Sequence, residues 1–403
     1  MASTTSSGVP DWVRAARDLY LVAIALFVVN IVIGILNGAD VVEFDRNQIL
    51  THVHAGTVGW LTLTIVAATM LLFRATDRRL TLALVIAVPV YILAFYTGNL
   101  AFRAISGTLL LVVIGWLLLW LWREYLGGER SLPRFAVTLG LTSFAYGAVL
   151  GVVLQISLAA GVLVLPGDAI GAHASAMTFG YLVLVAFGII EWRILGTRDM
   201  PRAGLLQVLA LFVGGFVISV ALLTGATQAG GGIYLLAQLV AVVLFVVRIW
   251  PASLRVNWLE SAPVRHLAAA SIWVVAALIL FMYLVFSFMT AADPTNPNAL
   301  PINVLVASDH AVYIGVITNG ALGLLSLLAL SRLERSSWIG HLMFWGVNLG
   351  LLVFVIGLIV DTAELKRIGA PVMGIVLLLS LAILALGTWR ASDEQLGEAA
   401  AGV

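Results

Sequence analysis

Four histidines, His52, His54, His173 and His310, lie near the starts of three apolar segments. An imidazole inside a bilayer is energetically costly and usually has a function. Imidazoles that converge from separate helices can ligate the iron of a haem or another metal ion. We therefore take these four residues as the candidate metal-ligating and cofactor-binding residues. The alternative is that each imidazole hydrogen-bonds a backbone carbonyl in a packed helix bundle.

The composition places the chain in a membrane. Of its 403 residues, 62% are hydrophobic and 10% are charged, whereas a soluble domain carries about 25% charged residues. The sequence has no cysteine, which excludes disulfides, thiolate-ligated iron–sulfur clusters and the covalent attachment of c-type haem. Any haem would be b-type or another haem held non-covalently by histidine.

The apolar segments predict an all-α protein with twelve transmembrane helices, because each is close to 20 residues long and is bounded by charged residues, glycine or proline. We expect residues 1–17 and 390–403 to be cytoplasmic tails around one transmembrane domain, 18–389. The predicted spans are 18–37, 51–73, 80–101, 104–122, 136–161, 170–190, 203–225, 230–250, 266–290, 303–330, 338–360 and 369–389.

The distribution of basic residues predicts the orientation. With a cytoplasmic N-terminus, all but four of the 21 Lys and Arg residues fall on the inside, as the positive-inside rule requires. The even-numbered spans then run from outside to inside, and the four histidines lie in the outer half of the membrane. His266 and His341 begin odd-numbered spans, so we expect them at the inner face without a ligand. The four outer basic residues are Arg46, Arg103, Lys366 and Arg367.

Spans 2 and 6 resemble each other. The segments THVHAGTVGWLTL and AHASAMTFGYLVL align His52 with His173 and Gly59 with Gly180. The tenth span keeps a histidine but loses the glycine register. A period of four spans predicts three parallel four-helix units in a pseudo-threefold arrangement.

The two histidines of span 2 point in different directions. Two residues apart on a helix, the side chains of His52 and His54 diverge by about 200°. They cannot bind one metal ion together, but they can serve two sites on opposite sides of the helix.

The segment from Thr51 to Trp60, THVHAGTVGW, resembles the H-V-H-x-G-x-x-G-W segment of haem–copper oxidases and nitric oxide reductases. In that superfamily the two histidines ligate haems on either side of one helix, on the tenth span. The NnrS family of twelve-span haem and copper proteins is similar in having H-x-H on the second span and a lone histidine on the tenth. The methionine-bearing continuation of the NnrS motif is absent here, and the chain has no adjacent His-His pair for an oxidase-type copper site.

The resemblance implies that His52 and His54 are axial haem ligands. One would pair with His173 to give a six-coordinate haem, and the other would face His310 at either a second haem or a single metal ion with an open position. The sequence does not decide which faces which. The resemblance also implies basic partners for the haem propionates. Arg103, in what we predict to be a very short outer loop, and Arg46 are the candidates.

Two further residues are candidates for chemistry near the metal. Asp309 is the carboxylate placed furthest inside an apolar span, where it could orient a ligand or relay protons. Tyr313 follows His310 by three residues and is predicted to share its helix face. In oxidases a tyrosine near the metal donates a proton and an electron.

These observations favour a haem-binding membrane protein that handles or senses a diatomic gas, nitric oxide or oxygen. An oxidoreductase of the nitric oxide reductase or oxidase type, a sensor and a scavenger all stay open. Expected partners are membrane lipid, the gas, and an electron-donor protein or quinol, with no nucleic acid. The alternatives are a transporter that uses the histidines as a substrate or proton site, and a structural or sensory subunit.

Overall fold

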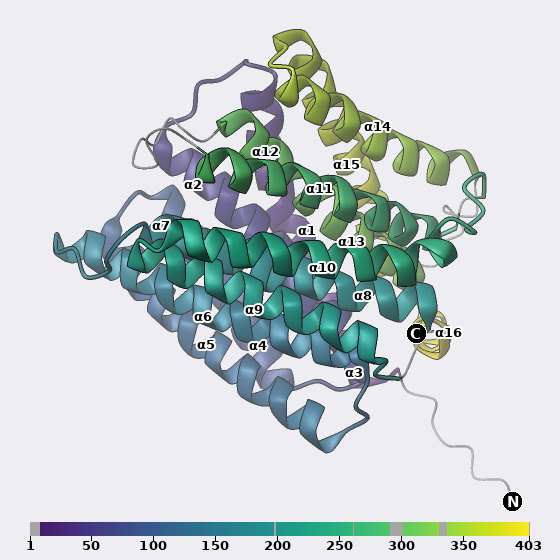
Figure 1. Ribbon diagram of the computed structural model, residues 1–403. Coiled ribbons are helices and arrows are strands. Elements are labelled where there is room, and N and C mark those ends of the chain that lie inside the picture. The colour runs from purple at the N-terminus through teal and green to yellow at the C-terminus, as the bar shows by residue number, and fades with distance from the viewer. Residues whose placement is uncertain (1–8, 197–198, 261, 291–300, 330–336, 403) are drawn as a thin grey trace, which may run out of the picture.

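The computed structural model describes residues 9–196, 199–260, 262–290, 301–329 and 337–402. All regular secondary structure in these ranges is helical, and twelve helices are long and apolar enough to cross a membrane. The twelve-span prediction is confirmed (Figure 1). Nine spans, numbered 1, 3, 4, 5, 7, 8, 9, 11 and 12 along the chain, are single helices: α1 (Asp11–Gly38), α4 (Arg78–Tyr96), α5 (Leu100–Gly127), α6 (Leu132–Ala160), α9 (Arg202–Thr224), α10 (Thr227–Ser253), α11 (Val264–Met289), α14 (Ser337–Ile359) and α15 (Ala363–Arg390). A further helix, α16 (Asp393–Gly402), follows the last span.

The other three spans, 2, 6 and 10, are composite. In each, an α-helix widens into eight residues of π-helix and then continues as an α-helix. A π-helix is rare and occurs mostly at functional sites, so three of them at a period of four spans are a strong structural repeat. The segments are α2 (Arg46–His54), η1 (Ala55–Thr62) and α3 (Leu63–Phe73); α7 (Ala169–Ser175), η2 (Ala176–Val183) and α8 (Leu184–Leu195); and α12 (Ile302–His310), η4 (Ala311–Thr318) and α13 (Asn319–Ala329).

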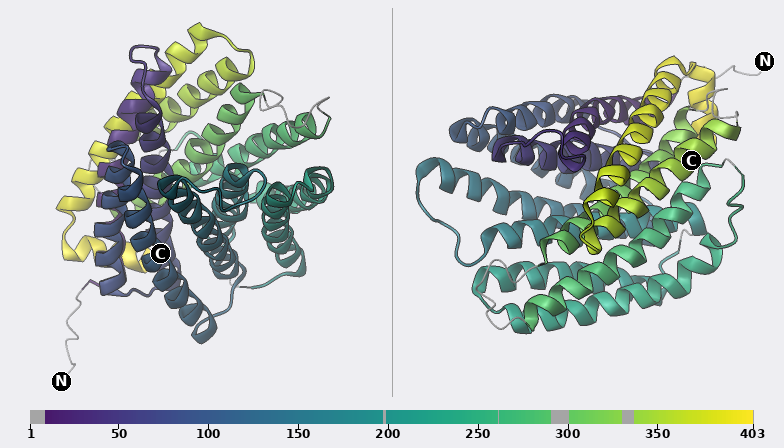
Figure 2. Two further views of the ribbon diagram at one scale, coloured as in Figure 1. Left: turned by 90° about the vertical axis from the view of Figure 1, so that its left-hand side faces the viewer. Right: turned by 90° about the horizontal axis from the view of Figure 1, so that it is seen from above.

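Spans 2, 6 and 10 form the centre of the bundle. Between 78% and 89% of their apolar windows are buried, compared with 28–56% for the other nine spans. Their second halves along the chain, α3, α8 and α13, contact one another pairwise, and the remaining helices surround them (Figure 2). The molecule is therefore three helices ringed by nine, and most of each central span packs against protein rather than lipid.

The starts of the central spans share one end of the bundle. In Figure 1, α2, α7 and α12 lie opposite the end that carries the N and C marks. We call the end with α2, α7 and α12 the histidine face and the opposite end the terminal face. The cytoplasmic location of the termini stays a prediction.

The boundary between spans 3 and 4 differs from the sequence-based one. We predicted span 3 over 80–101 and Arg103 in a short loop, but α4 ends at Tyr96 and Arg103 lies in the first turn of α5. Gly98 has a φ of 70°, which favours glycine, and the Asn99 side chain accepts a hydrogen bond from the backbone N–H of Phe102 at 2.9 Å. The Gly-Asn pair ends one helix and caps the next.

The glycine register predicted to be lost in span 10 is present. Each π-segment carries a glycine at its fifth position, Gly59, Gly180 and Gly315. A Cβ at these positions would lie 3.0 Å from Leu26, 3.1 Å from Ser143 and 2.5 Å from Trp273. Each glycine thus admits a side chain of the span that precedes its own. The structural register aligns His310 with His54, and His52 with His173 and Ser308.

The preceding spans 1, 5 and 9 repeat in the same way. Their residues in contact with the central spans recur every four positions, as expected for one face of an α-helix. The equivalent positions are 26, 30 and 34 in span 1, 143, 147 and 151 in span 5, and 273, 277 and 281 in span 9. These matches define unit 1 as spans 1–4, unit 2 as spans 5–8 and unit 3 as spans 9–12.

A buried ion pair ties unit 2 together at the terminal face. Arg248 of α10 pairs with Glu191 of α8, whose side chain is 1% exposed. Arg248 also donates to the Gln207 side chain of α9 at 3.0 Å. Removing one member of such a pair leaves a charge inside the protein without its compensating partner, so the pair fixes how these three spans pack.

Candidate cofactor site

The four histidines form two pairs on opposite sides of span 2. His54 lies within electrostatic range of His173, across the interface between units 1 and 2. His52 lies within electrostatic range of His310, across the interface between units 1 and 3. These interactions favour His54 with His173 and His52 with His310, the pairing that the sequence left open. His52 and His54 face different neighbouring units, as their angular separation on a helix requires.

All four imidazoles are held in the same tautomeric state by backbone carbonyls. The Nδ1 atom of His52 lies 2.9 Å from the carbonyl oxygen of Asn30, and that of His173 lies 2.8 Å from the oxygen of Gly147. His54 and His310 contact the carbonyls of Leu50 and Val306, four residues earlier, both at 2.8 Å. A carbonyl only accepts, so a proton on Nδ1 satisfies the four carbonyl contacts and leaves the Nε2 lone pair free. Nδ1 of His52 also lies 3.1 Å from the side-chain nitrogen of Asn30.

The free Nε2 atoms satisfy a requirement of metal ligation. A ligating histidine almost always donates its other N–H to a carbonyl or carboxylate. Among the described residues, no group is hydrogen-bonded to Nε2 of any of the four. The backbone hydrogen bonds that we weighed as an alternative to ligation are present, but they use the nitrogen that a metal would not need.

Two glycines make room for two of the rings. A Cβ at Gly34 would lie 3.0 Å from Cε1 of His52, and one at Gly151 would lie 2.8 Å from Cε1 of His173. These glycines are equivalent in spans 1 and 5. Each preceding span therefore supplies the carbonyl that orients the imidazole. Four residues later, the same span has a glycine, so that no side chain displaces the ring.

The third interface, between units 2 and 3, has the same backbone and different side chains. Ser308 occupies the position of His52 and His173, and its hydroxyl donates to the carbonyl of Ala277 at 3.4 Å, the equivalent of Asn30 and Gly147. Ser175 occupies the position of His54 and His310. Phe281 stands where units 1 and 2 have glycine, with its ring centroid 3.5 Å from that of Phe179. An aromatic ring thus fills the third interface in place of an imidazole pair.

Two cations accompany the His54–His173 pair. Arg103 is 4% exposed, and its guanidinium lies 4.6 Å from the centroid of the Phe95 ring, which stacks on His54 at 3.8 Å. Arg103 donates to the Asn47 side chain and to the Phe95 carbonyl, both at 2.8 Å. Arg46 is exposed, near enough to Arg103 to interact electrostatically. Both predicted cofactor-binding arginines therefore lie on the side of span 2 that carries His54.

Asp309 and Tyr313 face away from the imidazoles. His310 contacts Phe354 of span 11, with ring centroids 5.0 Å apart, whereas the Tyr313 hydroxyl lies 3.2 Å from Thr178 Oγ1 in span 6. Asp309 interacts electrostatically with Tyr313. The prediction that Tyr313 shares a face with His310 was wrong. The wider π-turn begins at Ala311, and the α-helical spacing rule does not extend across it.

The inner histidines belong to a polar network that the sequence did not reveal. His266, which we expected at the interface, is 4% exposed, and its Nδ1 lies 3.0 Å from Asn319 Oδ1. Asn319 exchanges two hydrogen bonds with Asn348, which also accepts one from the Trp273 indole at 2.9 Å. His341 bonds Arg265. In the sequence, Asn319 and Asn348 were the signal that could have indicated this network, because both are polar residues in apolar spans.

The ligand count distinguishes between kinds of metal. Within the described ranges, no three His, Cys, Asp or Glu side chains are grouped so that they could hold a metal ion. A bare zinc or copper ion takes three or four protein ligands, whereas haem iron needs one or two beyond its macrocycle. The two imidazoles at each of the two histidine-bearing interfaces match the number of protein ligands that haem iron takes. Comparisons with protein-family models and with curated proteins find no match to this chain.

Proposed function

We propose that this polytopic membrane protein binds haem through two histidine pairs, His54 with His173 and His52 with His310, and handles or senses a diatomic gas there. The observation that carries the proposal is the common state of the four imidazoles. Each is oriented by a backbone carbonyl at Nδ1, each has a free Nε2, and each has a partner imidazole across a unit interface.

The residues around the pairs fit this cofactor. Gly34 and Gly151 accommodate the rings of His52 and His173, and Phe95, Tyr91 and Phe354 supply flat apolar surfaces near the histidines. Arg103 and Arg46 lie where they can bind propionates of a haem held by His54 and His173. When bound, haem would supply one-electron chemistry and affinity for a diatomic gas.

The resemblance of THVHAGTVGW to haem–copper oxidases, nitric oxide reductases and the NnrS family supports nitric oxide or oxygen as the gas. If the protein turns over, an electron-donor protein or a quinol supplies electrons, and the reaction is that of an oxidoreductase. Asp309 and Tyr313 occupy the third interface, where they hold or move a proton at the Tyr313 hydroxyl rather than touch the gas. A copper site is not part of the proposal.

The test is an absorption spectrum of the detergent-purified protein, oxidised and dithionite-reduced. We expect a Soret band and a reduced α-band that are about halved in H54A and in H52A and lost in the double variant. H341A is the matched control, because its imidazole bonds Arg265 at the terminal face. A shift on adding nitric oxide would identify an open coordination position. Colourless protein from haem-replete cells would refute the proposal and favour the transporter.

A further inference from the structure

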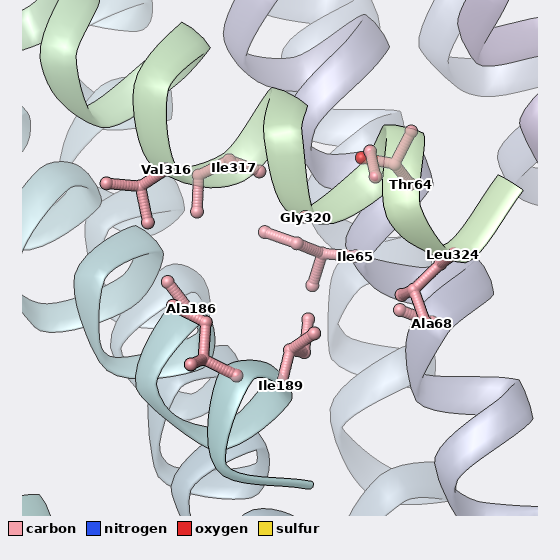
Figure 3. Close-up of a pocket in the computed structure, with 11 residues that line it drawn as sticks. Thr64, Ile65, Ala68, Ala186, Ile189, Val316, Ile317, Gly320 and Leu324 are labelled. Carbon is pink, nitrogen blue, oxygen red and sulfur yellow. The ribbon is translucent and has the colours of Figure 1, made fainter. Parts of the chain in front are cut away.

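The three central helices enclose a cavity on the terminal side of the π-segments. It is lined by α3, α8, the end of η4 and the start of α13 (Figure 3), and every lining residue is buried. The side chains of Ile65, Ala186 and Ile317 point into it. It lies where the three units meet and is distinct from the two histidine pairs.

The repeat explains why space remains there. Ile65, Ala186 and Ala321 are equivalent positions of the three units, and so are Ala68, Ile189 and Leu324. Each of these two sets of equivalent positions has at least one alanine where another unit has isoleucine or leucine. The three helices pack around a common axis, but the side chains at equivalent positions differ in size. Where alanine replaces a larger side chain, the volume that the larger side chain would occupy stays unfilled.

The lining offers almost no hydrogen bonds. Thr64 is the one lining residue with a polar side chain, and its hydroxyl already donates to the carbonyl of Leu61 at 2.9 Å. The centre of a water-sized sphere can move through about 20 Å³ of the cavity, enough for one small molecule. A buried water needs two to four polar partners, and apolar cavities without them stay dry and take up xenon or small hydrocarbons.

We propose that this cavity binds a small apolar gas molecule, of the size of dioxygen or nitric oxide. Such molecules dissolve in the hydrocarbon of a bilayer, where the cavity lies, and lose no hydrogen bonds when they enter an apolar site. Along span 2, Thr64 follows His54 by ten residues, which is less than about 15 Å because most of them lie in η1, whose wider turns rise less per residue than those of an α-helix. The cavity can therefore hold a gas molecule close to the proposed haem, but its affinity for gas does not depend on haem.

Four lining isoleucines, Ile65, Ile189, Ile190 and Ile317, make the inference measurable without any cofactor. The protein is labelled with ¹³C at isoleucine δ1-methyl groups in lipid nanodiscs and placed under increasing xenon pressure. We expect saturable chemical-shift changes at these four methyl groups. Ile86 and Ile279 are 56% and 60% exposed on the lipid-facing surface, so their shifts should grow linearly. Dissolved oxygen should broaden the same four signals more than those of the two controls.

Three variants test the site from both directions. A186L fills the cavity and should abolish the saturable response, and I65A enlarges it and should strengthen xenon binding several-fold. A203L, at an exposed position of α9, is the matched control and should leave the response unchanged. In the wild-type protein, linear shifts at all six of these isoleucines, the four in the lining and the two controls, would overturn the proposal. So would a saturable response that survives A186L, or, if A186L fails to fold, one that I65A does not alter.

Discussion

Adding a single methyl group at Gly151 should displace His173 and weaken one of the two histidine pairs. The added carbon would lie 2.8 Å from Cε1 and 3.0 Å from Nδ1 of the imidazole, whereas ordinary contacts begin at 3.4 Å. Since Gly151 is inside α6, the helix backbone cannot move away easily, and the ring must retreat. The retreat lengthens the 2.8 Å hydrogen bond from Nδ1 to the carbonyl of Gly147.

The energetic terms have opposite signs. Overpacking costs about 1–3 kcal/mol, and a weakened hydrogen bond costs up to about 1 kcal/mol. Replacing glycine by alanine within a helix returns about 1 kcal/mol. We therefore expect the free energy of unfolding of G151A to fall by up to about 3 kcal/mol. We expect G34A to be affected less, because its added carbon would lie 3.0 Å from His52 Cε1 rather than 2.8 Å.

The assay is thermal unfolding in detergent together with the haem spectrum. G151A should unfold at a lower temperature and lose the part of the α-band that H54A also loses. The matched control is G115A in α5, where an added methyl group meets no atom within 4 Å; its spectrum and stability should equal or exceed those of the wild type. A G151A protein with wild-type spectrum and unfolding temperature would refute the steric argument for the site between units 1 and 2.

Three further outcomes follow from other contacts. E191L should destabilise the protein by about 3–5 kcal/mol, since it removes the carboxylate that compensates the buried Arg248 charge, and thermal unfolding should show most of the loss restored in E191L/R248M. N348L should cost about 1–3 kcal/mol by leaving buried amide and indole groups without partners, measured in the same assay. In the loop before span 12, the hydrogen bond and charge of Lys366 hold the pKa of the Asp361 carboxyl below its ordinary value. The ionised carboxylate therefore stabilises the fold at a pH above the ordinary carboxyl pKa. This stabilisation is lost as the pH falls through the lowered pKa. A carboxyl NMR titration should show this pKa rise in K366M.

The sequence predicts the twelve spans because burial in lipid demands long apolar runs, and these are directly visible. It predicts that His52 and His54 serve opposite sides because two residues on a helix diverge by a fixed angle. The pairing with His173 and His310 could not be predicted, because it depends on which neighbour packs on each side. In the sequence, the packing around His52 and His173 is reflected in the glycines of spans 1 and 5, Gly34 and Gly151.

The π-segments explain the remaining errors. A π-turn leaves the apolar composition of a span unchanged, so neither hydropathy nor residue type marks where η4 begins. Without the start of η4, the α-helical spacing put Tyr313 on the same face as His310. The third interface was overlooked for a related reason: Ser308 and Phe281 signal nothing by themselves and gain meaning only as the equivalents of His52 and Gly34.

The common depth of the four imidazoles has a consequence for membrane voltage. His52 and His54 are separated by about 3 Å along one helix, and their partners occupy equivalent positions in the repeat. A charge that passes from one pair to the other moves parallel to the bilayer plane, not across it. Moving a charge fully across the membrane costs about 2.3 kcal/mol per 100 mV, but this path crosses almost none of that potential. Exchange between the two sites should therefore proceed at the same rate in energised and de-energised membranes.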